Sequence, residues 1–160
     1  MAISEAMKKA FNESYQGSSN FYKFLESDFQ RKKDRLCSIL NRAPFNYKVL
    51  NPEGGFFVLV DITNAIPDIP IKYFYKEGTS TNEKPVGDTF KSLKNPDHSP
   101  DYAFCKWLTF ENGVTPIPLS TFYDNSQAKS VQDFRVTNFV RFAICKSDET
   151  LDEVEKRLLK

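Results

Sequence analysis

The chain has 160 residues, of which 40 % are hydrophobic and 27 % charged, values typical of one globular domain rather than of a disordered segment. The formal net charge is +1 and the basic and acidic residues are interleaved, which argues against a nucleic-acid-binding surface. No apolar run approaches the ~20 residues that a membrane-spanning helix needs, so we expect no membrane span.

The cysteines and the N-terminal residues indicate where the protein resides. Cys37, Cys105 and Cys145 are widely spaced and form no C-x-x-C pair, so neither a disulfide framework nor a zinc site is predicted. We expect reduced, mostly buried thiols and an intracellular protein. The start, MAISEAMKKAF, has no secretory apolar core, and Glu5 argues against a mitochondrial presequence. A mature form without its targeting segment would look the same, so the cytoplasm and the mitochondrion both stay open.

Two helices are predicted at the N-terminal end of the chain. Apolar residues recur at spacings of three and four over residues 3–12, which indicates a short amphipathic helix. A second, longer helical pattern runs from near Asn20 to about Arg42, where Ala43 and Pro44 are expected to end it. Ser18 or Ser19 is the expected N-cap of this second helix.

A β-hairpin is predicted next, from residues 47–50 and 56–61, joined by a turn over residues 51–55. The adjacent pair Gly54 and Gly55 admits two interpretations. It serves either as an ordinary turn with positive φ or as a point where the backbone passes close to another strand or a ligand. The sequence favours the turn.

The regular pattern is lost between Ile62 and Pro100, where five prolines alternate with polar residues and one short aromatic piece, residues 73–75. Irregular segments of this length are usually functional lids or inserted pieces. A helix is predicted from Asp101 to Glu111, and Gly113 is expected to close it. Residues 114–119 predict an extended, proline-containing segment at a sheet edge, followed by a polar surface loop over residues 120–137.

Residues 138–145, NFVRFAIC, predict a strand covered on both faces, with the single charge of Arg141 in its middle. A guanidinium cannot lose its proton, so a buried one needs an anion or several acceptors. Two interpretations are open. Either Arg141 reaches the surface or pairs with a core carboxylate such as Asp61, or it binds the carboxylate of a ligand through both terminal nitrogens.

A final helix is predicted from Leu151 onward, with Thr150 and Glu153 as its capping box. The order of helices and strands predicts an α+β fold: a two-layer sandwich in which helices cover one side of a small, largely antiparallel sheet. No metal-binding or nucleotide-binding motif is present. The lone histidine, His98, lies among prolines and is interpreted as a solvated loop residue rather than a catalytic base.

Three stretches stand in a specific order: EGGFFVLVD at 53–61, NGVTPIPLSTFY at 112–123 and FVRFAICKSDETLDEVEKRL at 139–158. Together they resemble the C-terminal small domain of the fold-type I, class I/II, pyridoxal-phosphate-dependent aminotransferases. They are most similar to the kynurenine aminotransferase and cysteine-conjugate β-lyase group. The resemblance implies that residues 1–45 are inter-domain helices and that residues 46–160 are the small domain, with an irregular insertion at about 70–100.

The resemblance also implies roles for individual residues. The arginine of the family's FVRF strand binds the substrate carboxylate, and this role falls on Arg141. Phe122 and Tyr123 stand on the loop that lines the family's substrate entrance and are expected to be pocket neighbours. The family's first helices pack on its large domain, so the isolated chain is expected to expose an apolar face that includes Ile3, Met7, Phe11, Phe21 and Phe24.

The residues that hold the cofactor in this family belong to a large domain that this sequence lacks. No lysine here stands in the family's Schiff-base motif, so the chain alone is expected to be inactive and to bind no cofactor. The resemblance implies a homodimeric enzyme that moves the amino group of an amino acid, with kynurenine as one candidate, to a 2-oxo acid. The alternative is a non-catalytic fragment or subunit that binds protein partners.

Overall fold

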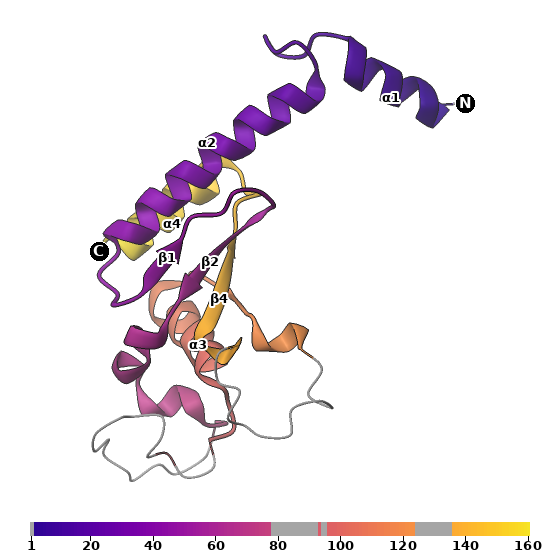
Figure 1. Cartoon of the computed structure of the whole chain (residues 1–160). Helices are drawn as coiled ribbons and strands as arrows, with labels where there is room; N and C mark the ends of the chain where they lie inside the picture. Colours follow the sequence, from indigo (N-terminus) through magenta and orange to yellow (C-terminus); the bar gives the residue numbers. More distant parts are fainter. Residues whose placement is uncertain (1, 78–92, 94–95, 124–135) are drawn as a thin grey trace.

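The computed structural model describes residues 2–77, 93, 96–123 and 136–160, and its helices and strands confirm the α+β class (Figure 1). A four-stranded sheet lies beside the helices. In chain order the elements are α1 (Ala2–Asn12), α2 (Phe21–Arg42), β1 (Lys48–Leu50), β2 (Phe57–Asp61), α3 (Pro100–Asn112), β3 (Ile117–Pro118), β4 (Phe139–Ala143) and α4 (Asp148–Leu158). Short 3-10 turns cover Thr63–Asp68, Ile71–Phe74, Ser120–Phe122 and Val136–Asn138.

The sheet is antiparallel throughout, with the strand order β1-β2-β4-β3. The predicted hairpin is present as β1 and β2, and β3 lies at an edge as its prolines suggested. The strand that carries Arg141, β4, is central, because it pairs with β2 on one side and with β3 on the other.

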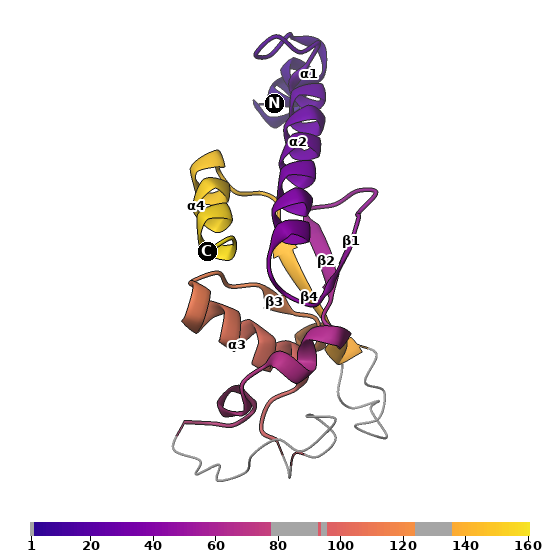
Figure 2. The same cartoon turned by 90° about the vertical axis from the view of Figure 1, so that its left-hand side faces the viewer.

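Only one face of the sheet is covered by helices among the described residues. Val58, Val60 and Val140 are fully buried on that face, and Figure 2 shows α3 and α4 on the same side of the sheet. The residues that alternate with them, including Leu59 and Arg141, face the other way and remain partly exposed. The prediction that β4 is covered on both faces is therefore wrong for the described structure. Phe139 and Ala143, on the outer face with Arg141, are also apolar, so the sequence of β4 does not alternate between apolar and polar residues.

The residues that cap α2 and α4 lie one to three positions before or after the predicted caps. Asn20, rather than Ser18 or Ser19, caps α2, since its side chain accepts a hydrogen bond from the Lys23 backbone N–H at 2.9 Å. Ser147, rather than Thr150, caps α4 by accepting a hydrogen bond from the Thr150 backbone N–H. In each case the side-chain oxygen lies three residues before the N–H that it accepts from, which is the standard N-cap spacing.

The first part of the irregular segment belongs to the core. Two 3-10 turns follow β2. Tyr73 and Phe74 in the second turn are buried, as are Ile69 and Tyr75, which follow the first and second turn, so the predicted aromatic piece packs inside the domain. Residues 78–92 and 94–95 of the predicted insertion lie outside the described residues. The helix after it is confirmed as α3, and Gly113 ends it in the left-handed conformation with φ of +67°.

The N-terminal helix and the first turns of α2 project away from the sheet (Figure 1). Ile3, Met7 and Phe11 on α1 are 80 %, 51 % and 53 % exposed, which agrees with the expected apolar face. Phe21 and Phe24 are half-buried, because the ring of Tyr15 packs edge-on against both. None of the described helices is long and apolar enough to cross a membrane.

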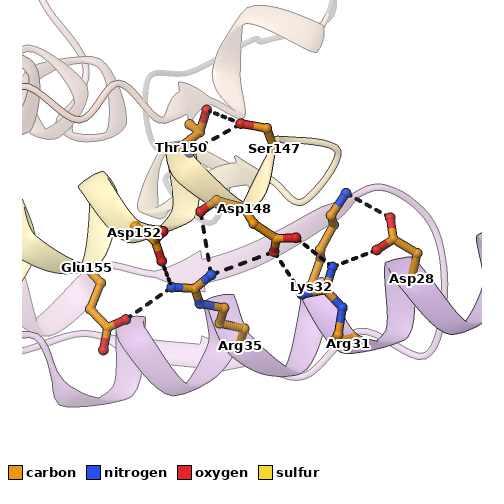
Figure 3. A network of polar contacts seen from close by, with 9 residues as sticks. All are labelled: Asp28, Arg31, Lys32, Arg35, Ser147, Asp148, Thr150, Asp152 and Glu155. Carbon is orange, nitrogen blue, oxygen red and sulfur yellow. Dashed lines mark hydrogen bonds and ion pairs between the residues drawn. The ribbon is translucent and has the colours of Figure 1, made fainter.

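A network of charged side chains joins α2 to α4 (Figure 3). Arg31 donates hydrogen bonds to Asp148 on α4 and to Asp28 on its own helix, both at 2.7 Å. Arg35, one turn further along α2, contacts Asp148 and Asp152. The hydrogen bond from Arg31 is the main reason why the pKa of Asp148 lies below its ordinary value. The network fixes α4 along the second half of α2.

This network predicts a stability that depends on salt and pH. Raising the ionic strength from about 0.1 M to about 1 M shortens the Debye length from about 10 Å to about 3 Å, so a small fall in Tm is expected. Because the pKa of Asp148 is lowered in the fold, its contribution is present above the ordinary aspartate value of 3.8 and is lost as the pH falls through the lowered pKa. The Asp148→Asn variant should remove part of the salt dependence in thermal melts. Glu26→Gln, which affects only an exposed pair with Lys23, should not.

Candidate functional site

Arg141 lies in the middle of the sheet, on the face that the described helices leave uncovered. It stands directly opposite Leu59 of β2 on one side and opposite Ile117 of β3 on the other. Strand alternation places its side chain on the same face as Leu59, whereas Val140 and Phe142 point into the helical layer. The backbone of Arg141 is therefore held by two flanking strands.

Two aromatic rings enclose the guanidinium of Arg141. Its central carbon lies 4.2 Å from the centre of the Phe57 ring and 3.8 Å from the centre of the Phe122 ring. Its Nε atom is buried and has no hydrogen-bond partner. Such contacts stabilise the cation through the faces of the rings but provide no acceptor for its N–H groups. The arginine is thus partly desolvated without a counter-ion in the described part of the chain.

Asp61, the core carboxylate that was considered as a partner, does not pair with Arg141. It stands opposite Phe139, and its carboxylate accepts hydrogen bonds from the backbone N–H and the hydroxyl of Thr63, at 2.9 and 2.6 Å. No other carboxylate of the described residues forms an ion pair with Arg141. The interpretation that Arg141 pairs with Asp61 is therefore wrong, and the interpretation that it binds a ligand carboxylate stays a prediction.

A pocket of about 450 Å³ opens beside Arg141. The turn between β1 and β2, residues 51–55, forms one wall, and most of the other lining side chains are apolar. They are Leu50, Phe56, Phe57, Leu59 and Leu119, with Arg141 as the one cation of the lining. This volume lies within the range of pockets that hold small-molecule ligands. Besides Arg141, the polar side chains of the lining are Asn51 and Glu53 in the turn. One positive fork in a mostly apolar pocket suits a carboxylate that carries an apolar or aromatic side chain.

The glycine pair in the β1–β2 turn behaves as the sequence favoured. Gly55 has φ of +84°, a conformation that side-chain-bearing residues rarely adopt, whereas Gly54 has an ordinary φ. A Cβ atom built on either glycine meets no heavy atom within 4 Å. The pair therefore serves the turn rather than a close backbone approach, although both glycines contribute to the pocket wall.

The Gly55→Ala variant is expected to lose about 1 kcal/mol of unfolding free energy, because alanine is strained at positive φ. Carboxylate binding should stay unchanged, since a methyl group at this position has free space. Urea unfolding and a binding titration on the same preparation measure both quantities. Gly54→Ala is the matched control and should be nearly neutral. Weaker binding by a Gly55→Ala variant of normal stability would show that the turn also shapes the pocket.

The segment that carries Phe122 is anchored by a buried carboxylate. Asp101, at the start of α3, is fully buried and accepts hydrogen bonds from the backbone N–H of Ser120 at 2.7 Å and from the Ser99 hydroxyl at 2.6 Å. Ser120 begins the 3-10 turn that ends at Phe122. The anchor thus places the Phe122 ring over Arg141. Phe122 and Tyr123 are 57 % and 56 % exposed and neither is among the residues that line the pocket, so their roles as pocket neighbours stay predictions.

Phe57 is the residue of this site that the sequence reasoning missed. It belongs to the apolar run of β2, where it looked like one more core residue. Its position opposite Ala143 places it diagonally across from Arg141 on the same face. Only the strand alternation together with the β2–β4 register could have identified it, and the register is not readable from the sequence alone.

His98 lies away from this site. It is half-buried against the Tyr102 ring, with the ring centres 4.5 Å apart, so it is less solvated than the loop residue that the sequence predicts. Burial, with the Lys106 ammonium group as a second cause, lowers the pKa of His98. Within the described ranges, no group of three or more His, Cys, Asp or Glu side chains is placed to hold a metal ion.

Comparison with known proteins relates this geometry to a family. No family model matches the chain. The chain is 29 % identical to mouse kynurenine–oxoglutarate transaminase 3 over 136 residues, which are 85 % of the chain. It is 30 % identical to the Dictyostelium discoideum kynurenine–oxoglutarate transaminase over 141 residues, which are 88 % of the chain. The chain is a relative of the kynurenine aminotransferases. It covers 24 % of the mouse protein and 27 % of the Dictyostelium protein, in their C-terminal parts.

Comparison with solved structures shows a similar fold in aminotransferases. The aspartate aminotransferase of Rhizobium meliloti superposes on 90 % of the chain with a TM-score of 0.53 at 19 % identity, and the match covers 27 % of that enzyme. The fold is that of the aminotransferase small domain, as the sequence motifs had suggested. The chain spans about a quarter of the length of its kynurenine aminotransferase relatives.

Proposed function

We propose that the chain acts as the C-terminal domain of a pyridoxal-phosphate-dependent aminotransferase that moves the amino group of an amino acid to a 2-oxo acid. Arg141 binds the carboxylate of the amino acid in this role. The observation that carries the proposal is the Arg141 cation, which contacts two rings beside a mostly apolar pocket and has no carboxylate partner among the described residues. The names of the relatives supply the substrate pair for the first test, kynurenine and oxoglutarate.

Physical chemistry favours a carboxylate over other ligands for this pocket. The guanidinium keeps its charge at any working pH, and the two rings replace water around it without giving its N–H groups an acceptor. A carboxylate accepts two parallel, charge-assisted hydrogen bonds from one guanidinium, which neutralises the charge and fixes the orientation of the ligand. A neutral ligand would leave the cation uncompensated.

The residues that line the pocket do not by themselves fit pyridoxal phosphate. The lining includes no lysine whose amine could bond the aldehyde of the cofactor, and its one cation is the arginine assigned to the substrate. We therefore assign the cofactor to a large domain outside this chain. The present residues bind and orient the substrate, and no chemical step is assigned to them.

The same proposal covers the domain organisation and the assembly. Residues 1–45 join this domain to the large domain, residues 46–160 form the small domain, and residues 70–100 are an insertion within it. The complete enzyme is a homodimer inside the cell, in the cytoplasm or the mitochondrion. The exposed apolar side chains of α1 and the uncovered sheet face support the presence of a further domain that packs on them.

The test of this function uses the full-length gene product and the isolated 160-residue chain in parallel. The full-length protein should form glutamate from 2-oxoglutarate when kynurenine or another aromatic or sulfur amino acid is the donor. The isolated chain should form none, and it should keep no stoichiometric absorption band of pyridoxal phosphate after dialysis. A stable band on the isolated chain would contradict the assignment of the cofactor to another domain.

A second function is supported by the apolar N-terminal face. A domain that exposes Ile3, Met7 and Phe11 could serve as a non-catalytic subunit whose partner is a separate protein. The length of the encoded protein separates the two functions. A gene product with a large domain ahead of this region favours the aminotransferase, whereas a gene product of this length favours the subunit.

The apolar face predicts that the isolated chain self-associates. Light scattering on the purified chain should detect species larger than the monomer, and a hydrophobic dye should bind, because these side chains lie outside the core. A Met7→Lys, Phe11→Lys double variant should reduce both signals. A monodisperse wild-type monomer that binds no dye would argue against any missing partner for this face.

A further inference from the structure

The two rings beside Arg141 come from separate elements. Phe57 belongs to β2 and is fixed by its ladder with β4, where it stands opposite Ala143. Phe122 ends the 3-10 turn after β3, and its backbone N–H donates to the Leu119 carbonyl oxygen at 3.1 Å. The Ser120 N–H at the other end of this turn is bound by the buried Asp101 carboxylate. Both rings are thus placed by backbone contacts and do not depend on a ligand for their positions.

The position between the rings restricts the arginine before any ligand is bound. A free arginine side chain has one of the largest rotamer entropies of the amino acids, and a ligand that must order it binds more weakly. Here the guanidinium lies 4.2 and 3.8 Å from two ring centres, and neighbouring strands fix its backbone on both sides. With two rings packed against the guanidinium and Nε buried, the terminal nitrogens are the part that a ligand carboxylate would bind.

We propose that Phe57 and Phe122 are positioning residues, which hold the guanidinium of Arg141 in the orientation that a substrate carboxylate requires. This inference rests on the proposed role of Arg141 as the carboxylate-binding residue. The rings act in two ways. They confine the side chain to one orientation, and they keep water from the part of the guanidinium that they cover, which strengthens the charge-assisted hydrogen bonds of its terminal nitrogens.

The test measures binding of a carboxylate that does not react. The probe is 3-phenylpropionate, and 3-phenylpropanol, which has the same ring and chain but no charge, is the control ligand. Calorimetric titrations use the full-length protein. Phe122→Leu is the first variant, because this side chain is 57 % exposed and its loss should not unfold the domain. Phe57→Leu is the second, and Phe122→Tyr restores an aromatic ring.

Each leucine variant is expected to weaken 3-phenylpropionate binding by about three- to tenfold, the effect of losing one cation–π contact at a partly desolvated site. Binding of 3-phenylpropanol should change by less than about twofold, and Phe122→Tyr should bind the carboxylate as the wild type does. In an Arg141→Ala background, Phe122→Leu should cause no further loss, since the two residues then have no interaction to remove. Phe110→Leu, which removes an exposed ring on α3, is the matched control and should bind normally.

The outcomes separate this inference from the proposed function. If Arg141→Ala weakens carboxylate binding and the leucine variants do not, the rings have no positioning role and Arg141 keeps its own. Equal losses for the acid and the alcohol would show that the rings only shape the pocket, which overturns the inference as well. If Arg141→Ala leaves 3-phenylpropionate binding unchanged, the proposed function of Arg141 and the positioning role both fail.

Discussion

Replacing Arg141 by alanine in the full-length gene product is expected to lower kcat/KM for the amino acid substrate by about 100-fold or more. The variant loses two charge-assisted hydrogen bonds to a carboxylate in a partly desolvated pocket, and the loss of such a contact typically costs several kcal/mol. The measurement is the rate of the amino-acid half-reaction at several substrate concentrations. Rates within about twofold of the wild type would refute the carboxylate-binding role, because a twofold change is far smaller than the effect of losing such a contact.

Stability provides the control for the Arg141 variants. Arg141 forms no ion pair with the described residues and its Nε has no hydrogen-bond partner, so its loss should remove only its two ring contacts and lower the unfolding free energy by about 1 kcal/mol. Arg141→Lys keeps the charge but lacks the planar fork, and we expect it to recover only part of the activity. A variant that loses activity and stability together would instead point to a structural role for this residue.

The sequence predicted the elements well where a local pattern decides the structure. The apolar spacing over residues 3–12 and the run from Asn20 to Arg42 became α1 and α2. Gly113 was recognised as the end of α3, because a left-handed C-terminal residue is a local property that favours glycine. Position at a sheet edge was also readable, since Ile117–Pro118 contains a proline that cannot donate to a ladder.

Residue patterns predicted only the central residue of the candidate site, Arg141, and the family resemblance added Phe122 as an expected pocket neighbour. A lone arginine in an apolar run is conspicuous, whereas Phe57 and Phe122 are ordinary phenylalanines until the β2–β4 register and the turn after β3 bring them to Arg141. Contacts between residues far apart in the sequence are set by tertiary packing, which single-sequence patterns do not encode. The same limit explains the missed Asp101, which was interpreted as a helix start although its carboxylate also binds the distant Ser120.

The uncovered sheet face explains why one local prediction was wrong. A short apolar run normally indicates a strand that is buried on both sides, and β4 is such a run apart from Arg141 at its centre. In the described structure its outer face, which carries Arg141, is covered only in part. The composition of β4 is therefore suited to a more buried environment than this chain provides. Packing of a further domain on this face would remove the disagreement, in line with the proposed function.

The Asp101→Ala variant is expected to lose about 3 kcal/mol of unfolding free energy, because a buried carboxylate that accepts several hydrogen bonds is removed. Its oxygens accept from the backbone N–H groups of Tyr102 and Ser120 and from the Ser99 hydroxyl, at 2.9, 2.7 and 2.6 Å. Without it these donors lose their acceptor, and the turn that carries Phe122 is no longer tied to α3. Urea denaturation with a tryptophan or circular-dichroism signal measures the loss.

Asp101→Asn sharpens this prediction, since an amide keeps one acceptor oxygen and loses the other. Its unfolding free energy should lie between that of the alanine variant and that of the wild type. The matched control is Asp68→Ala, because Asp68 is exposed at the end of a 3-10 turn and should change the stability by less than about 0.5 kcal/mol. If Asp101→Ala is no less stable than Asp68→Ala, the carboxylate does not anchor the Phe122 turn. The position of that ring over Arg141 must then depend on β3 and the turn's own backbone hydrogen bonds.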